Sequence, residues 1–443
     1  MDHPVSVKSR LARERSPFDC VALLLQGGGA LGAYQAGVYQ AMDEAGLEPD
    51  WIAGISIGAI NAAIVAGNSR ETRIDRLRQF WQRVSSPPGW GQTAGITQQA
   101  SLRPYLAALE LGERLLHGAA GAFGAEAPTL AASQGWRALW QSAALAGTQW
   151  DPTSLVKGDA ARGMLNQLSA NAALLGGVTG FFKPRTPSPW LWPDGAFEAT
   201  SYYDTAPLRA TLEELVDFDR LNAGETRFSV GAVNVQSGNF VYFDSTERRI
   251  GPEHVMASGA LPPAFPAIEI EGAFYWDGGL VSNTPLHWIM ECGAPARTLA
   301  FQVDLWSARG DFPGNMAQVT TRQKEIQYSS RTRAMSDRVK HLSAVRNALA
   351  TLLEKLPPEL KDSAEARLLA PQAERKLLNL VQLIYRSRRY EGDSKDYEFS
   401  PRSMEEHWSS GYNDTKRGLR LPGVLQLPDN TSGVAIFDAG EKL

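Results

Sequence analysis

Short apolar runs alternate with helix-length stretches in the first part of the chain. Residues 21–25 and 51–55 are apolar runs of the kind that form buried parallel strands. Residues 33–45 favour a helix that Gly46 closes, and the small residues at 59–66 favour another helix. This alternation predicts a mainly parallel sheet with helices packed on it.

The alternation stops near residue 86 and resumes with strand-like residues 228–234 and 240–244, ending with 298–303. Between residues 86 and 204 the chain is rich first in alanine and glycine and then in proline, which indicates an insertion. We therefore predict a flexible N-terminal arm (1–18), an α/β domain (19–305) with an insertion or lid (about 86–204), and a C-terminal extension (306–443).

The insertion is rich in large apolar side chains. They are Trp136, Trp140, Trp150, Phe181, Phe182, Trp190, Trp192, Phe197, Tyr202 and Tyr203. Such residues line acyl-chain pockets and lids, and they also serve as ordinary packing, so both interpretations stay open.

The C-terminal extension carries an amphipathic pattern. Apolar positions from Met335 to Leu356 recur at spacings of three and four, beside seven basic residues in 321–350. This helix either docks on anionic lipid or packs on the α/β domain with a solvated basic face, and packing is the commoner role. A second apolar run covers residues 377–385.

The most informative short motif is Gly54-Ile55-Ser56-Ile57-Gly58, between an expected strand and an expected helix. Such a turn exposes the serine hydroxyl, and glycines on both sides remove side chains that would clash where the chain reverses. The helix directs N–H groups and its positive dipole end at Ser56, which favours developing negative charge. We interpret Ser56 as a nucleophile, with an ordinary turn serine as the alternative.

A glycine-rich loop, Gln26 to Gly32, follows the first apolar run. Backbone N–H groups of Gly27, Gly28 and Gly29 can converge on an oxyanion, and one such donor lowers an acyl-transfer barrier by about 3 kcal/mol. Gly27, Gly29 and Gly32 also match the dinucleotide fingerprint G-x-G-x-x-G. That fingerprint needs an acidic residue at the end of the second strand, whereas Asp50 precedes this strand and the serine turn ends it.

A serine nucleophile needs a proton acceptor. None of the six histidines (His3, His117, His254, His287, His341 and His407) lies in a motif that indicates a triad, although spacing alone leaves a Ser-His-Asp triad open. Asp277-Gly278-Gly279 ends a strand-like stretch at 274–276, and residues 282–285 then open a helix. Asp277 is thus a candidate base, with a simple Asp-Gly turn as the alternative.

In combination, the glycine loop, the serine turn and Asp277-Gly278-Gly279 resemble the patatin-like phospholipases. Residues 257–266 (ASGALPPAFP) and 227–243 are similar to further segments of that family, and residues 390–412 look like the extension of a bacterial subgroup. The resemblance implies a three-layer α/β/α core with a mainly parallel sheet and a mostly helical C-terminal extension.

The resemblance also implies a mechanism for this chain. Ser56 would be the nucleophile of a serine–aspartate dyad, Asp277 its base, and Gly27, Gly28 and Gly29 the oxyanion hole, supported by Gly32, Gly54, Gly58, Gly278 and Gly279. The substrate would be a lipid or another acyl ester, cleaved through an acyl-enzyme without a metal or cofactor. One departure is Leu31, where the family usually has Arg or Lys, and this puts a phosphate-bearing substrate in question.

Composition limits the classes of partner and the cellular compartment that we expect. A net charge of −4 gives no basic field for nucleic acid, and two cysteines, Cys20 and Cys292, suit a reducing compartment. The N-terminal residues lack the apolar core of a signal peptide, and no apolar run reaches membrane-spanning length. We expect a cytoplasmic protein, with peripheral contact at the inner membrane face as an option.

Two other classes of function stay open at this stage. One is a nucleotide-dependent oxidoreductase that uses Gly27, Gly29 and Gly32. The other is a weakly active interaction protein on a hydrolase scaffold, with its role carried by residues 306–443.

Overall fold

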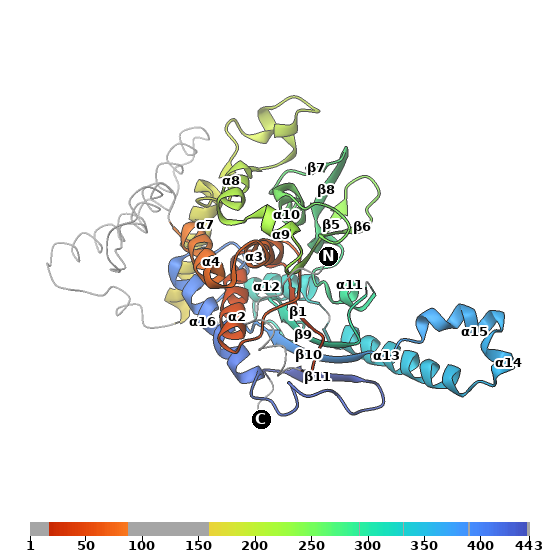
Figure 1. The fold of residues 1–443 in the computed structure, drawn as a ribbon. Coiled ribbons are helices and arrows are strands. Elements are labelled where there is room, and N and C mark those ends of the chain that lie inside the picture. The colour runs from red at the N-terminus through yellow and green to blue at the C-terminus, as the bar shows by residue number, and fades with distance from the viewer. Residues whose placement is uncertain (1–16, 87–158, 292, 331, 389, 441–443) are drawn as a thin grey trace, which may run out of the picture.

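A mixed sheet of nine strands forms the centre of the computed structural model, which describes residues 17–86 and 159–440 except 292, 331 and 389 (Figure 1). The strands are β1 (Cys20–Leu25), β2 (Trp51–Gly54), β5 (Arg227–Asn234), β6 (Phe240–Asp244), β7 (Ile268–Ile270), β8 (Ala273–Asp277), β9 (Arg297–Asp304), β10 (Leu377–Ile384) and β11 (Val434–Asp438). Their order is β11-β10-β9-β1-β2-β5-β8-β7, and β6 also pairs with β5.

The strands from β11 to β5 run parallel, and the antiparallel pairs lie at the β5–β8 end. In the register of β1, Leu25 pairs with Gly54 of β2 on one side and with Val303 of β9 on the other. The carboxyl ends of three central strands therefore meet at one edge of the sheet, where ligands of open α/β sheets bind.

Helices cover both faces of the sheet, as the alternation along β1 requires. Val21, Leu23 and Leu25 belong to one buried core, and Cys20, Ala22 and Leu24 belong to another. The first core includes residues of α2 (Ala33–Glu44), α3 (Ile57–Ala66), α4 (Arg70–Val84) and α16 (Pro401–Gly418), and the second includes residues of α11 (Leu286–Glu291) and α13 (Thr332–Lys355). The predicted three-layer α/β/α fold is confirmed.

The remaining helices lie around this core. They are α7 (Asp159–Gly176), α8 (Ala206–Leu215), α9 (Phe218–Asn222), α10 (Pro252–Ser258), α12 (Met316–Tyr328), α14 (Pro358–Lys361) and α15 (Ala364–Leu369), with short 3-10 turns that include η1 (Gly29–Gly32) and η5 (Gly278–Leu280). Figure 1 shows the far end of α13, together with α14 and α15, extending away from the sheet as an arm.

The C-terminal region is mostly helical, as expected, and it also completes the central sheet. The apolar run at 377–385 contains β10, which pairs in parallel with β9, and β11 pairs with β10. Helix α16 packs closely on α2: a Cβ on Gly37 would lie 1.9 Å from the Trp408 carbonyl oxygen, and one on Gly411 would lie 1.9 Å from that of Tyr34. The division at 305/306 stays a sequence-based prediction, and residues on both sides of it share one sheet.

The insertion is described only from residue 159 onward, so Trp136, Trp140 and Trp150 lie outside the described residues. Phe181 and Phe182 are buried and pack against Phe265, whereas Trp190 is 82% exposed. Residues 1–16 of the predicted arm are likewise outside the described part, and Phe18 is buried. No helix in the described ranges has the length and apolarity needed to span a bilayer.

Candidate active site

Ser56 sits on a strained turn between β2 and α3. Its backbone has φ 56° and ψ −123°, and Glu271 is the other non-glycine residue with positive φ among those described. The flanking glycines permit this turn, because a Cβ on Gly54 would lie 2.4 Å from the Gly58 carbonyl and one on Gly58 would lie 2.3 Å from the Leu25 oxygen. Strain of this kind, of order 1–3 kcal/mol, persists only where surrounding contacts enforce it.

One of those contacts comes from Ser258, at the end of α10. The Ser56 N–H donates to the Ser258 hydroxyl oxygen at 3.0 Å, and that hydroxyl donates to the Gly231 carbonyl of β5 at 2.6 Å. Ser258 is fully buried. Ser258 lies within the segment 257–266, and its contact with the Ser56 N–H is not visible from the sequence of that segment.

Asp277 lies at the end of β8 and faces Ser56. Its carboxyl is 2% exposed and accepts the Gly279 N–H at 2.7 Å. Burial raises the pKa of Asp277 to about 7, against the lowering effect of the hydrogen bonds that Gly279 and the Ser56 hydroxyl donate to it. Gly278 lies beside β5, where a Cβ would be 2.6 Å from the Gly231 oxygen. The two predicted dyad residues are thus brought together.

The glycine loop passes beside the serine, since a Cβ on Gly27 would lie 3.1 Å from the Ser56 Cβ. The Gly27 N–H makes a long, 3.4 Å bond with the Asn283 carbonyl. In the described part of the chain, the N–H groups of Gly28 and Gly29 make no such bond to a backbone carbonyl. A Cβ added to Gly32 would lie 2.5 Å from the Ile57 Cγ1, so Gly32 packs closely against α3.

Two side-chain amides, those of Gln26 and Asn283, hold this loop. Gln26 is fully buried: its Oε1 accepts the N–H groups of Leu305 and Trp306, at 2.6 and 3.0 Å, and its Nε2 donates to Thr284. Asn283 Nδ2 donates to the carbonyl oxygens of Gly27 and Tyr328, at 3.1 and 2.8 Å. Both residues lie in segments that the motifs include. Their roles could not be predicted because their hydrogen-bond partners are distant in the sequence.

Leu31, which departs from the family pattern, is completely buried in the larger core. Its side chain packs among apolar neighbours of the sheet and α2. Burying a charged group at this position would remove its hydration, whereas leucine suits the apolar surroundings.

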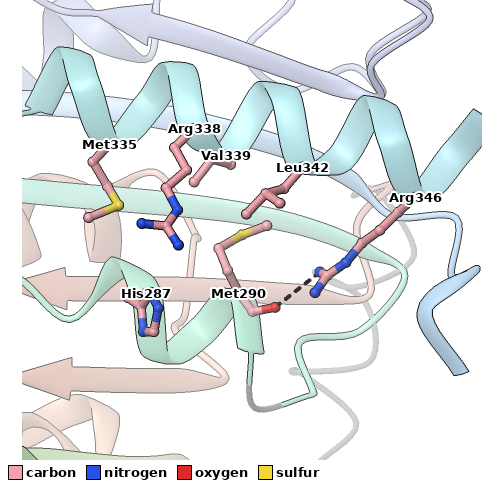
Figure 2. Close-up of a pocket in the computed structure, with 7 residues that line it drawn as sticks. All are labelled: His287, Met290, Met335, Arg338, Val339, Leu342 and Arg346. Atoms are coloured by element: carbon pink, nitrogen blue, oxygen red, sulfur yellow. Dashed lines mark hydrogen bonds between the residues drawn. The ribbon is translucent and has the colours of Figure 1, made fainter.

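The described histidines have other partners or positions. His254 Nδ1 accepts the Gly251 N–H at 3.0 Å, and His407 Nε2 lies 3.1 Å from a Glu391 carboxyl oxygen. His341 is exposed, and His3 and His117 lie outside the described residues. His287 lines a hollow between α11 and α13, together with Met290, Met335, Arg338, Val339, Leu342 and Arg346 (Figure 2).

That hollow is separate from the dyad, and its lining of α11 and α13 residues shares none with the serine turn or the glycine loop. Within residues 17–86 and 159–440, His, Cys, Asp and Glu side chains form no group of three or more that could hold a metal ion. Asp50, the acidic residue nearest the dinucleotide spacing, accepts the Val21 N–H at 2.9 Å. It therefore lies at the amino ends of the strands, away from the glycine loop.

Comparisons with known proteins point to one family. The family model "Patatin-like phospholipase" matches residues 23–288, and a model described as "Patatin phospholipase" matches residues 326–431. A "Lysophospholipase nte1" of Aspergillus terreus is 54% identical over 78 residues, and "Neuropathy target esterase sws" of Drosophila sechellia is 36% identical over 75 residues. Each match covers 17% of this chain and 5% of the relative, so the chain spans a small part of their length.

Among solved structures, VipD from Legionella pneumophila matches with a TM-score of 0.36 and 15% identity, over 91% of this chain and 67% of that chain. The first family model covers more than half of the sequence and contains the glycine loop, the serine turn and Asp277. The chain belongs to the patatin-like phospholipase family.

Proposed function

We propose that this protein is a serine acyl hydrolase that cleaves carboxylic esters of lipids through a dyad of Ser56 and Asp277. The observation that carries the proposal is the pairing of a serine on a strained turn with a buried carboxyl whose pKa is raised to about 7. An ordinary aspartate, with a pKa near 3.9, is a poor base, and a value near the working pH is what general base catalysis requires.

In the first half of the reaction, the Asp277 carboxylate accepts the hydroxyl proton while Ser56 Oγ attacks the ester carbonyl carbon. The carbonyl oxygen becomes negative, and the loop of Gly27, Gly28 and Gly29 supplies N–H donors to it. The positive end of α3 adds to this stabilisation, since Ser56 is the N-cap of that helix. Asp277 then returns the proton to the leaving alcohol, and an acyl-enzyme remains.

In the second half, water attacks the acyl-enzyme and gives a proton to Asp277. The tetrahedral intermediate collapses, the proton passes back to Ser56 Oγ, and the fatty acid leaves. These steps use no metal ion, so hydrolysis is expected to continue at the same rate with excess EDTA. A requirement for added Ca²⁺ after chelation would contradict this scheme.

Lipid esters are proposed as substrates because the chain belongs to a phospholipase family and because its relatives carry the names lysophospholipase and neuropathy target esterase. The first test is covalent labelling with a fluorophosphonate, followed by a series of p-nitrophenyl esters of increasing chain length. Wild type is expected to label at one serine and to hydrolyse esters, whereas Ser56→Ala does neither. Equal labelling of Ser56→Ala and wild type would remove the proposal.

A further inference from the structure

A C-terminal segment lies directly against the glycine loop of the candidate active site. The Asp396 carbonyl oxygen accepts the Ala30 N–H at 2.7 Å, just after the three consecutive glycines. A Cβ on Gly29, which has φ 56°, would lie 2.0 Å from that same oxygen. The Trp306 indole N–H also donates to the Gly27 carbonyl, at 3.0 Å. The loop is therefore fixed on this side by residues that follow β9 in the chain.

Two consecutive residues of α12 hold two consecutive residues of that segment. Lys324 Nζ donates to an Asp396 carboxyl oxygen at 2.6 Å and to the Asp393 carbonyl at 2.7 Å. Lys395 Nζ donates to a Glu325 carboxyl oxygen at 2.7 Å and to the Ser387 hydroxyl at 2.6 Å. We call the four charged residues Lys324, Glu325, Lys395 and Asp396 the clamp.

The clamp is a partly enclosed group of ion pairs. Each lysine pairs with one carboxylate, Arg322 also contacts Glu325 at 3.1 Å, and the side chain of Lys395 is only 2% exposed. Both ammonium groups also lie over the Trp306 ring, at 5.8 Å for Lys324 and 5.1 Å for Lys395. Removing one partner of the Lys324–Asp396 pair leaves the other charge without that compensation, which destabilises the contact between α12 and the segment.

The clamp is also linked to the glycine loop through the end of α12. The Tyr328 carbonyl accepts Nε2 of Gln26 at 3.2 Å and Nδ2 of Asn283 at 2.8 Å. Burial raises the pKa of Tyr328, and the negative charges of Asp396 and Asp277 raise it further. Helix α12 thus carries two of the four clamp residues, Lys324 and Glu325, and also the Tyr328 carbonyl that accepts from both side-chain amides.

We propose that Lys324 and Asp396 are positioning residues for the oxyanion loop, so that the C-terminal region controls the rate of the chemical step. This rests on the proposed acyl-hydrolase function. Consecutive glycines have the largest backbone freedom, whereas an oxyanion donor must be held within about 0.5 Å of its productive place. The clamp and the Ala30–Asp396 bond supply that restraint. Loss of one oxyanion donor costs about 10²- to 10³-fold in kcat, so a loosened loop is expected to cost about 10-fold or more.

The test compares wild type, the double variant Lys324→Met/Asp396→Asn, Lys324→Arg and a control, Lys416→Met, which removes an exposed ion pair with Glu44. The double variant avoids a lone buried charge. Burial raises the pKa of Asp396 and Lys324 opposes this shift, so assays are made at pH 8. The measurements are the fluorophosphonate labelling rate, kcat and KM for an ester, the melting temperature, and hydrogen exchange in peptides covering residues 26–32.

The double variant is expected to label and turn over about 10-fold more slowly, with KM within about 2-fold, and to exchange faster at residues 26–32. Lys324→Arg and Lys416→Met are expected to behave as wild type. If the double variant does not fold, Lys324→Gln/Asp396→Asn replaces it, because the Lys324 side chain is 24% exposed and a polar replacement there keeps its contact with water.

A folded variant that melts earlier but labels at the wild-type rate would show that the clamp only stabilises the fold, and would overturn the proposal. Unchanged exchange at residues 26–32 would overturn it as well. Failure of the proposed function gives a different result. In that case wild type itself does not label at Ser56, and the proposed positioning role is rejected as well.

Discussion

The serine turn and the glycine loop lie at the ends of neighbouring strands, β2 and β1, and they are held in different ways. The serine turn is tightened by its own glycines and by Leu25 of the adjacent strand, with one added contact from Ser258. The glycine loop depends on partners from Asn283, Trp306 and Asp396, more than 250 positions away in each case. A nucleophile can therefore be shaped by local sequence, whereas its oxyanion donors need the rest of the chain.

The largest effect is expected from the base. Asp277→Asn removes the proton acceptor, and general base catalysis contributes about 10²- to 10⁴-fold, so kcat should fall by about 10³-fold. The same substitution should lower activity but raise the stability of the folded protein at high pH. The folded-state pKa of Asp277 is raised, so its contribution to stability is present below the unfolded-state pKa near 3.8 and is lost as pH rises through about 7.

The Asn variant should therefore melt at a higher temperature than wild type at pH 8, by about 2 °C, with a smaller difference at pH 5. Calorimetry at the two pH values, combined with ester kinetics, checks both parts. A variant with full activity, or one that is less stable than wild type at pH 8, would contradict the assigned environment of Asp277.

The next largest effect is expected on the glycine-loop side. Gly29→Ala places a methyl group 2.0 Å from the Asp396 carbonyl oxygen, so the loop or the C-terminal segment must shift, and kcat should fall by about 10²-fold. Gly46→Ala is a matched control, because Gly46 also has a positive φ, 73°, and its Cβ would meet nothing within 4 Å. It should lose about 1 kcal/mol of stability and keep full activity. Similar activity losses in both variants would mean that backbone strain alone, and not the Asp396 contact, explains the result.

A smaller effect is expected from the contact that holds the serine turn. Ser258→Ala leaves the Ser56 N–H and the Gly231 carbonyl without their partner, which costs about 1–3 kcal/mol and should lower kcat by about 10-fold. Ser245→Ala is the control, since the Ser245 hydroxyl accepts the Phe228 N–H at 2.9 Å at the other end of β5. Melting temperatures should fall in both variants, and the labelling rate only in Ser258→Ala. An equal drop in labelling would refute a specific role for Ser258.

The smallest effect concerns strain in the turn itself. Ser56→Gly removes the Cβ from a residue with φ 56°, so the inactive variant should be more stable than wild type by about 1 kcal/mol. Glu271→Gly relieves a similar φ of 51° on the β7–β8 hairpin and should be stabilised while remaining active. Urea denaturation measures both changes. A Ser56→Gly variant that is less stable than wild type would show that the serine side chain contributes more through contacts than it costs in strain.

Much of this architecture was predictable from local pattern. The strands at 21–25, 51–55, 228–234 and 240–244 and the helix at 33–45 lie within a residue or two of their predicted bounds, because continuous apolar runs and glycine stops determine them locally. The positions of Ser56 and Asp277 at strand ends followed from the same pattern. Their meeting came from the family resemblance, since the sequence does not show that β5 lies between β2 and β8.

The remaining features depend on contacts between distant residues. The run at 377–385 was recognised as apolar, but its place beside β9 follows from parallel pairing across a long connection. The segment Ser394 to Glu398 contains ordinary polar residues, and only its contact with Ala30 relates it to the active site. The roles of Gln26, Asn283 and Ser258 were missed for the same reason.

The most direct test of the account is the pH dependence of fluorophosphonate labelling in wild type. This reaction requires the Ser56 hydroxyl and its base, and it does not require protonation of a departing lipid alcohol. Ionised Asp277 is the reactive form, so the labelling rate should rise with pH along a single titration with a midpoint near 7. A rate that is constant between pH 5 and 9 would contradict the claim that a buried carboxyl at residue 277 activates Ser56.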